Sequence, residues 1–245
     1  HLGEAPVISE LIVISKQLPD RVKKRFIVNL KKSGISRSSH KSERVILPRA
    51  MDLVWAALEL MKESEASAVD SSILHLILDY SDAFFQVPLN PAERCFAVIQ
   101  FRGKLYLFLR APQGSRGAPL LWARTCALVS RLAMSTCDLK KVKLNTYVDD
   151  PSFMTVGSQA DNQRTVVRLV CCWLLLGFKM AFSKAECAGL EQTITWTSIR
   201  ICLHRDAVTV QVKEQIVSDV EEHLLRLLST NVIAEDDLVS FLGKA

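Results

Sequence analysis

Residues 143–156 read KLNTYVDDPSFMTV, two apolar runs separated by the adjacent acids Asp149 and Asp150. The runs 143–148 and 152–156 predict two strands joined by a tight turn, and a turn alone would explain the acids, since Asp is a common turn residue. Neighbouring carboxylates between apolar strands also repel each other and are costly to desolvate. A bound cation removes that cost.

A third carboxylate ends another apolar run. Residues 72–79 read SILHLILD and predict a buried strand with Asp79 at its C-terminal end. Carboxylate oxygens suit Mg²⁺, and two such ions about 3.5–4 Å apart can clamp the attacking and leaving oxygens of a phosphoryl transfer. If the three carboxylates share such a metal pair, they should converge at the end of an antiparallel sheet, within about 4–7 Å of one another.

The rest of the chain mixes helices and strands without a regular β-α-β alternation, which predicts the α+β class. Further strands are predicted at residues 25–30 and 193–203, and a hairpin at 95–101 and 104–110. Helices are predicted at 52–62, 119–133, 161–176 and 215–228. Asp52 is the expected N-cap of the first helix, Pro119 opens the second and Gly177 closes the third.

Composition fits a globular protein of one domain or two intimate subdomains. Hydrophobic residues make up 49% and charged residues 23% of 245. The longest apolar run, 169–178, is too short to span a bilayer, and no secretory signal precedes the body of the chain, so we expect an intracellular protein without a membrane partner. Seven cysteines and five histidines show no zinc-site spacing, so reduced thiols and no structural zinc are expected.

Positive charge is concentrated near the N-terminus. The net charge is +5, but residues 20–49 hold ten Lys or Arg side chains against the two acids Asp20 and Glu43. Such a stretch suits a polyanion, although a solvated surface or basic linker explains it equally well. If it contacts phosphates, charge reversal at Lys31 and Lys32 should reduce the salt dependence of binding.

The ordered motifs resemble those of reverse transcriptases from retroviruses and retrotransposons. The matching segments are 25–28 (RFIV), 78–89 (LDYSDAFFQVPL), 112–119 (PQGSRGAP), 147–150 (YVDD), 177–184 (GFKMAFSK) and 194–197 (ITWT). Their order and spacing fit over residues 25–203. The resemblance implies a right-hand polymerase fold with an antiparallel palm sheet backed by helices. Fingers are expected at about 20–75 and 91–111, palm at 76–90 and 112–205, and the start of a thumb at 206–245 of a longer polyprotein.

The resemblance also implies a metal site and a proton donor. Asp79 and Asp149 would hold two Mg²⁺ ions, with Mn²⁺ as a possible substitute, and Asp150 would assist. Lys184 would protonate the leaving pyrophosphate, unless it is an ordinary surface lysine. Pro151 stands where the family usually has an aliphatic residue. It holds Asp150 extended and removes one donor from the strand ladder.

A nucleotide pocket follows from the same motifs. Arg25 would clamp the triphosphate, or be one more solvated basic residue. Asp82 and Ala83 would offer backbone N–H groups to it. Gln113 and Gly114 would line the pocket, with the glycine permitting close approach of the backbone.

Two aromatic residues carry further implied roles. Phe84 would lie under the sugar and leave no room for a 2′-hydroxyl, or simply fill the core. Trp196 and Thr197 would belong to a primer grip, although a buried aromatic in a strand is an equally good interpretation of Trp196.

The leading hypothesis is thus an RNA-directed DNA polymerase core of a retroelement, a nucleotidyltransferase whose partners are an RNA or DNA template with its primer and deoxynucleoside triphosphates. The alternative is an inactive remnant that keeps the fold and binds nucleic acid without synthesis. An RNA-dependent RNA polymerase is disfavoured by Phe84, because ribonucleotides generally need a smaller or polar residue there. A plain α+β binding module would leave the ordered motifs as coincidence.

Overall fold

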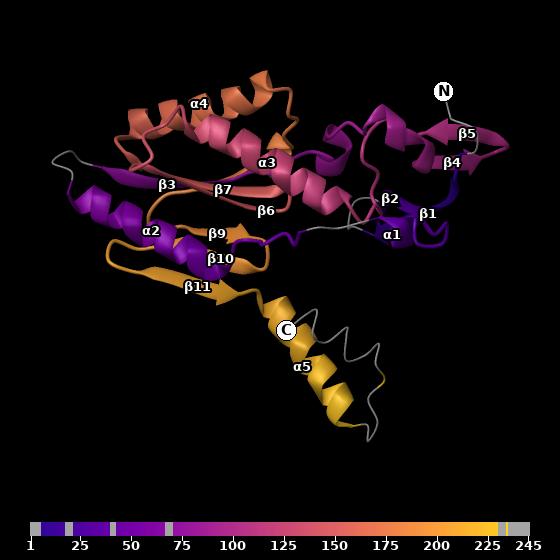
Figure 1. The fold of residues 1–245 in the computed structure, drawn as a ribbon. Helices are drawn as coiled ribbons and strands as arrows, with labels where there is room; N and C mark the ends of the chain where they lie inside the picture. Colours follow the sequence, from indigo (N-terminus) through magenta and orange to yellow (C-terminus); the bar gives the residue numbers. More distant parts are fainter. Residues whose placement is uncertain (1–5, 18–21, 40–42, 67–70, 230–233, 235–245) are drawn as a thin grey trace.

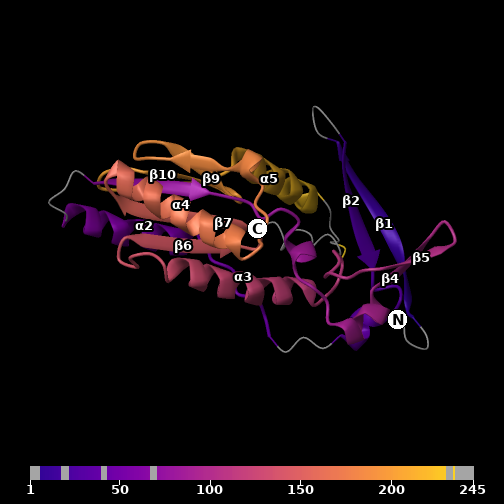
Figure 2. The same ribbon diagram turned by 90° about the horizontal axis from the view of Figure 1, so that it is seen from above.

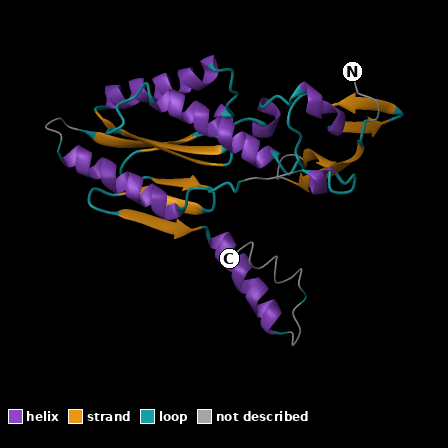
Figure 3. Cartoon of the chain, viewed as in Figure 1, coloured by secondary structure: helices purple, strands orange, loops and turns teal. Residues whose placement is uncertain are grey.

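The computed structural model describes residues 6–17, 22–39, 43–66, 71–229 and 234. Over these residues the chain has three β-sheets, with helices packed on them, which confirms the α+β class (Figure 3). In this described part, no helix is both long enough and apolar enough to cross a membrane.

The helices agree well with the sequence pattern. They are α1 (Ile35–Ser38), α2 (Ala50–Glu65), α3 (Ala118–Met134), α4 (Gln159–Leu175) and α5 (Glu214–Leu228), with short 3₁₀ helices η1 (Ala83–Gln86), η2 (Pro91–Phe96) and η3 (Phe182–Lys184). Gly177 ends the α4 segment with a φ of 84°, as expected for a helix-terminating glycine. The expected N-cap of α2 is wrong. Arg49 is the N-cap, and the Asp52 carboxylate accepts a hydrogen bond from its backbone N–H at 2.6 Å, in a capping box.

The central sheet has the strand order β6-β7-β3-β8 and is antiparallel throughout. Its strands are β3 (Ser72–Ile77), β6 (Val142–Tyr147), β7 (Asp150–Gly157) and β8 (Glu186–Ala188). Helices α3 and α4 lie together over one face of this sheet, whereas α2 lies on the other (Figure 1). The predicted strands on either side of the acids are therefore confirmed.

Alternation along these strands divides the apolar residues between two cores. Leu76 of β3 and Phe153 of β7 face α3 and α4, where they pack with Trp122 and Trp173. The neighbouring positions on each strand point to the opposite face and pack against α2 and the three-stranded sheet. Because side chains alternate with a period of two, one apolar strand supplies both cores.

The three-stranded sheet has the order β11-β10-β9 and consists of β9 (Thr193–Trp196), β10 (Ile199–Leu203) and β11 (Val208–Val212). The single strand expected at 193–203 is wrong, because the chain reverses at Thr197 and Ser198 and forms an antiparallel hairpin. Thr197 has a φ of 52°, a conformation that non-glycine residues seldom adopt.

The N-terminal sheet has the order β2-β1-β4-β5 and lies beyond one end of the central sheet (Figure 2). It consists of β1 (Ile8–Gln17), β2 (Val22–Asn29), β4 (Val98–Phe101) and β5 (Lys104–Leu107). The predicted strand at 25–30 and the hairpin around Gly103 are confirmed, and β1 is an additional strand.

Two of the expected subdomain boundaries do not coincide with structural boundaries. A division at about residue 75 would separate α2 from the core that it shares with β7. A division at about 205 would separate β11 from its partner β10. The buried contacts favour boundaries before α2 and before α5 instead.

Candidate active site

The backbone brings Asp79 and Asp149 together from distant parts of the sequence. Asp79 lies two residues beyond β3, and the N–H of the next residue, Tyr80, donates to the carbonyl oxygen of Asp149 at 2.8 Å. On its other side, the Asp79 carbonyl accepts from Ala181 N–H, also at 2.8 Å. Three segments therefore meet at one end of the central sheet.

The turn that carries the acid pair is held by two indoles. Val148 has a φ of 55° and Tyr147 pairs with Asp150 across the turn. Trp122 of α3 donates from Nε1 to the Val148 carbonyl at 2.6 Å, and Trp196 of β9 donates to the Asp150 carbonyl at 2.9 Å. Because the indoles approach from both cores, the turn is fixed on each side. The sequence showed both tryptophans but not this role.

The carboxylates influence one another electrostatically. Burial raises the pKa of Asp149, and the negative charge on Asp79 adds to the rise, whereas the cations Lys184 and Arg25 oppose it. Burial also raises the pKa of Asp150 to about 6, with further contributions from the charges of Asp149 and Asp79 and from a side-chain hydrogen bond with Asp79. The three acids therefore influence one another electrostatically, and their expected separation of about 4–7 Å stays a prediction.

This donor set fits divalent cations that prefer oxygen ligands. All three side chains are carboxylates, and burial together with the charge of the neighbouring acids raises the pKa of Asp149 and Asp150. In the described chain, the ligand atoms of Asp79, Asp149 and Asp150 are not all within 4.8 Å of one another. The trio is therefore more open than a cage around a single ion.

Lys184 is the basic side chain bonded to these acids. Its Nζ lies 2.5 Å from Oδ2 of Asp79, whose side chain is only 15% exposed. Residues 105 positions apart in the sequence are thereby joined. The ammonium compensates part of the carboxylate charge, which lowers the pKa of Asp149 and Asp150 against the effect of burial.

The first motif turns sharply after Tyr80. Asp82 has a φ of 51° and precedes η1, where Ala83 is buried and Phe84 is partly buried against the core under α3 and α4. Gln86 fixes this turn, because its amide donates to the Ser81 and Lys179 carbonyls at 2.6 and 3.0 Å and accepts from Lys179 N–H at 2.8 Å. No sequence pattern predicts this positioning role of Gln86.

Strand β2 reaches the site through the second motif. Val28 N–H donates to the Gln113 carbonyl at 2.9 Å, and Gly114 follows with a φ of 102°. A Cβ at Gly114 would lie 2.2 Å from the Val28 carbonyl oxygen. The close approach that requires glycine is thus made to the backbone of β2. Arg25, on the same strand, is exposed and acts electrostatically on Asp149.

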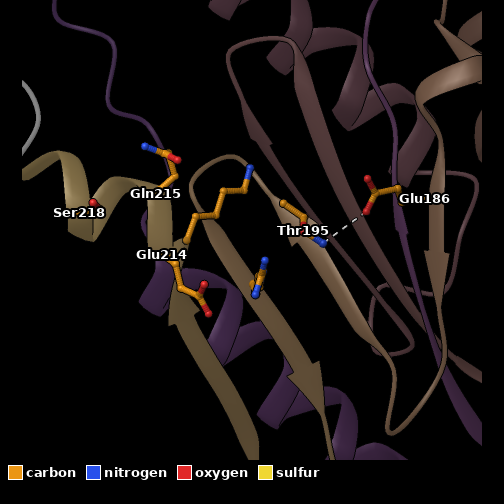
Figure 4. Close-up of a pocket in the computed structure, with 7 residues that line it drawn as sticks. Glu186, Thr195, Glu214, Gln215 and Ser218 are labelled. Atoms are coloured by element: carbon orange, nitrogen blue, oxygen red, sulfur yellow. Dashed lines mark hydrogen bonds between the residues drawn. The ribbon is translucent and has the colours of Figure 1, made fainter. Parts of the chain in front are cut away.

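The predicted primer-grip residues form the end of the β9–β10 hairpin. Trp196 is 1% exposed, so its ring supports the acid turn from below the surface, and the Thr197 carbonyl accepts from Lys213 Nζ at 2.6 Å. Beside this hairpin is a pocket of about 560 Å³ (Figure 4). It is lined by Glu186, Thr195, Arg200, Lys213, Glu214, Gln215 and Ser218.

The basic stretch is only partly described, since residues 20, 21 and 40–42 lie outside the described chain. Lys31 and Lys32 are exposed at the end of β2. Lys32 forms an ion pair with Glu10 at 3.1 Å.

Comparison with known proteins gives a consistent result. A family model described as reverse transcriptase (RNA-dependent DNA polymerase) matches residues 13–201. Protein P of duck hepatitis B virus (strain China) is 34% identical over 109 residues, which cover 44% of this chain and 13% of that protein. Protein P from a further isolate, white Shanghai duck, matches at the same identity over the same length. The chain thus spans about an eighth of the length of these curated relatives.

Two solved structures share the fold. The foamy viral protease-reverse transcriptase dRH in complex with double-stranded DNA superposes with a TM-score of 0.62 at 15% identity, covering 96% of this chain and 35% of the other. The foamy viral protease-reverse transcriptase in complex with an RNA/DNA hybrid gives a TM-score of 0.60 at 15% identity, covering 98% and 27%.

Proposed function

The chain belongs to the reverse transcriptase (RNA-dependent DNA polymerase) family, and we propose that it adds deoxynucleotides to a primer 3′ end by two-metal phosphoryl transfer. One observation carries this proposal. Asp79, Asp149 and Asp150 interact at the end of an antiparallel sheet, where burial and, to a smaller extent, repulsion between the acids raise the pKa of Asp149 and Asp150. A site of this kind favours divalent cations.

Asp79 and Asp149 would hold two Mg²⁺ or Mn²⁺ ions, with Asp150 assisting. Bound there, the ions would stabilise the charge that develops on the attacking and leaving oxygens. The protein supplies position: the two tryptophan hydrogen bonds fix the acid turn, and the Asp149–Tyr80 backbone bond fixes the spacing of the acids. Such fixed positioning is the main source of catalysis in phosphoryl transfer.

Lys184 would supply the proton for the pyrophosphate leaving group. In this structure its ammonium is bonded to Asp79. Once cations compensate the Asp79 charge, the ammonium would be released from this pair and could turn toward the triphosphate. A lysine beside the reacting phosphates can both neutralise charge and donate a proton.

The nucleotide would lie between β2 and the turn after Tyr80. Arg25, which already acts on Asp149, would bind the triphosphate, and the N–H groups of Asp82 and Ala83 would face its phosphates. Gln113 and Gly114 would close the pocket from the second motif, through their contact with β2. This assignment places β1, β2, β4 and β5 in the fingers.

A primer strand would run along the β9–β10 hairpin. Thr197 stands at its turn, and the neighbouring pocket presents Arg200 and Lys213, both suited to backbone phosphates. Trp196 would act indirectly, by holding the hairpin against the acid turn. The solved relatives contain double-stranded DNA or an RNA/DNA hybrid, which supports a template–primer duplex as the partner.

Primer extension tests the proposal. The 245-residue chain is incubated with a primer annealed to an RNA or a DNA template, deoxynucleotides and Mg²⁺. Extension on both templates, lost on chelation, is the expected result. Tight binding of the duplex without extension under any metal condition would contradict the enzymatic proposal and favour a remnant that only binds nucleic acid.

A further inference from the structure

A second group of potential metal ligands lies apart from the acid turn. The described chain contains one set of Cys, His, Asp or Glu side chains whose ligand atoms all lie within 4.8 Å of one another, namely Glu191, Cys202 and His204. The family motifs assign no role to these residues. The thiol and the imidazole are partly buried, and the carboxylate is exposed.

The β-hairpin geometry brings the three side chains together. Cys202 alternates with the buried Ile201 and Leu203 on β10, and His204 directly follows the last residue of that strand. Glu191 precedes β9 and is tied to the end of β10, because its N–H donates to the Leu203 carbonyl at 2.8 Å. The spacing Cys-x-His does not match the paired spacings of common zinc sites. For that reason the sequence predicted no structural zinc.

The imidazole of His204 is held on both sides. Nδ1 lies 2.6 Å from the Glu191 carboxylate, and Nε2 lies 2.9 Å from Oγ1 of Thr209. Thr209 is the cross-strand neighbour of Cys202 on β11. Because a carboxylate only accepts, Nδ1–H donates to Glu191, and Nε2 accepts from the threonine hydroxyl. A hydrogen bond at the far nitrogen is the usual way in which a metal-binding histidine is oriented.

We propose that Glu191, Cys202 and His204 bind a divalent transition-metal ion of the Zn²⁺ class, with Thr209 as a positioning residue. Thiolate, imidazole and carboxylate are the ligand types that Zn²⁺ takes, whereas Mg²⁺ prefers oxygen ligands alone. Binding replaces the contact between Nδ1 and the carboxylate by two metal bonds. At normal bond lengths of about 2.0–2.2 Å, this separates the two atoms by less than about 1 Å more. The thiol proton is released to solvent, and the imidazole changes tautomer: Nδ1 loses its proton as the metal binds and Nε2 gains one, which it donates to the Thr209 hydroxyl. Water completes the coordination.

The site would fasten the open end of the three-stranded sheet. It connects the segment before β9 to the β10–β11 hairpin, at the opposite end of β9 and β10 from the Thr197 turn. Metal occupancy would therefore stabilise the sheet that supports the acid turn through Trp196. The proposal does not depend on polymerase activity, since it rests on a different set of residues.

Cobalt absorption provides a direct test. The 245-residue chain, stripped of metal with a chelator, is titrated with Co²⁺ in the presence of excess Mg²⁺. We expect thiolate-to-cobalt charge-transfer absorption with a 1:1 endpoint, loss of that absorption when Zn²⁺ is added, and a thermal midpoint that rises with Zn²⁺ concentration. Cys202→Ser should abolish the absorption. His204→Gln and Thr209→Val should each weaken Co²⁺ binding by about tenfold or more.

Cys187→Ser serves as the matched control, because Cys187 is an exposed thiol on β8 outside the cluster. This variant should leave the titration unchanged, and far-ultraviolet circular dichroism should confirm that every variant is folded. Two results would overturn the proposal. One is the absence of thiolate–cobalt absorption in the folded parent chain, which would make the group an ordinary histidine–glutamate pair. The other is absorption that persists in Cys202→Ser.

Discussion

The indole Nε1 of Trp196 donates a hydrogen bond to the backbone carbonyl of Asp150 at 2.9 Å. This bond joins the β9–β10 hairpin to the turn that carries the paired acids. The ring is buried and also meets Tyr147 edge-on at 6.0 Å, so packing and a hydrogen bond both connect the hairpin to the turn. Trp196, which the resemblance assigns to the primer grip, thus helps to position the turn that carries Asp149 and Asp150.

Trp196→Phe should therefore impair catalysis more than folding. The substitution keeps an aromatic ring but removes the donor, which costs about 1 kcal/mol of stability. We expect kcat for primer extension to fall by about tenfold, since small displacements of catalytic groups are costly, while KM for the nucleotide changes little. Trp173→Phe is the control, because the Nε1 of this fully buried ring has no hydrogen-bond partner. Equal kcat values for the two variants would contradict the positioning role.

A second prediction concerns Gly114. Gly114→Ala introduces a Cβ 2.2 Å from the Val28 carbonyl oxygen at a φ of 102°. Overpacking and backbone strain together should cost more than about 3 kcal/mol. Gly103→Ala is matched, since Gly103 also has a positive φ, of 73°, but has open space around its Cα; it should cost only about 1–2 kcal/mol. Urea unfolding measures both. Similar losses of unfolding free energy in Gly114→Ala and Gly103→Ala would show that β2 can shift away from the added Cβ at little cost.

These two cases show what sequence could and could not supply. The strands around Asp149 and helices α3 and α4 follow from apolar runs and end signals within each segment. The alternation over 193–203 indicated one strand, because Thr and Ser are weak turn residues, and only the resemblance of 194–197 to a primer-grip hairpin pointed to the turn at Thr197, whose φ is 52°. The Gly114 contact depends on pairing between segments more than 80 positions apart, which no local pattern encodes.

The residues of the candidate site also fall into those with a signal in the sequence and those without one. The acids became candidates because ordered motifs that resemble those of reverse transcriptases surround them, whereas a turn alone would explain Asp149 and Asp150. The residues that position them, such as Trp122 and Gln86, act through backbone carbonyls. Since every residue has a carbonyl group, such bonds leave no compositional signal.

Phe84 tests sugar discrimination. Its ring is partly buried against the core under α3 and α4, so packing and exclusion of a 2′-hydroxyl remain separable only by experiment. Phe84→Ala should raise the ratio of ribonucleotide to deoxynucleotide incorporation by at least about tenfold, since it removes the ring that would exclude a 2′-hydroxyl. Phe85→Ala removes a similar volume from the adjacent ring, which stacks on Phe108 at 6.2 Å, and should leave the ratio unchanged. Unaltered selectivity in Phe84→Ala would assign this ring to packing alone.

His75 makes stability depend on pH. Burial lowers the pKa of this imidazole to about 4, so the unfolded chain takes up a proton first as pH falls. The resulting stability is present above about pH 6.5 and is lost as pH falls toward 4. Between pH 7 and 5, we expect a loss of about 2 kcal/mol that His75→Gln removes. Ser152→Ala, which deletes the hydroxyl 2.8 Å from Nε2, retains the titrating ring and should keep the loss. Parallel pH profiles for the parent chain and His75→Gln would refute this assignment.

The final prediction concerns Asp149 itself. Asp149→Asn keeps the shape of the side chain but removes a negative charge from the proposed metal ligands. Primer extension should fall by at least about 10²–10³-fold, because phosphoryl transfer relies on positioning and electrostatics that no neighbouring group can replace. Duplex binding should persist, since it depends mainly on basic residues.

The same substitution should stabilise the cation-free protein at neutral pH, because burial and the charge of Asp79 raise the pKa of Asp149 and so make its ionised form unfavourable in the fold. Stability and activity should therefore change in opposite directions. If Asp149 binds cations, the variant is more stable than the parent chain but less active. If Asp149 has only a structural role, the variant is both less stable and less active. Asp206→Asn, in the exposed β10–β11 turn, controls for a general change in charge and should alter neither. Extension by Asp149→Asn at a rate near that of the parent chain would place the chemistry elsewhere and remove the main support for a polymerase.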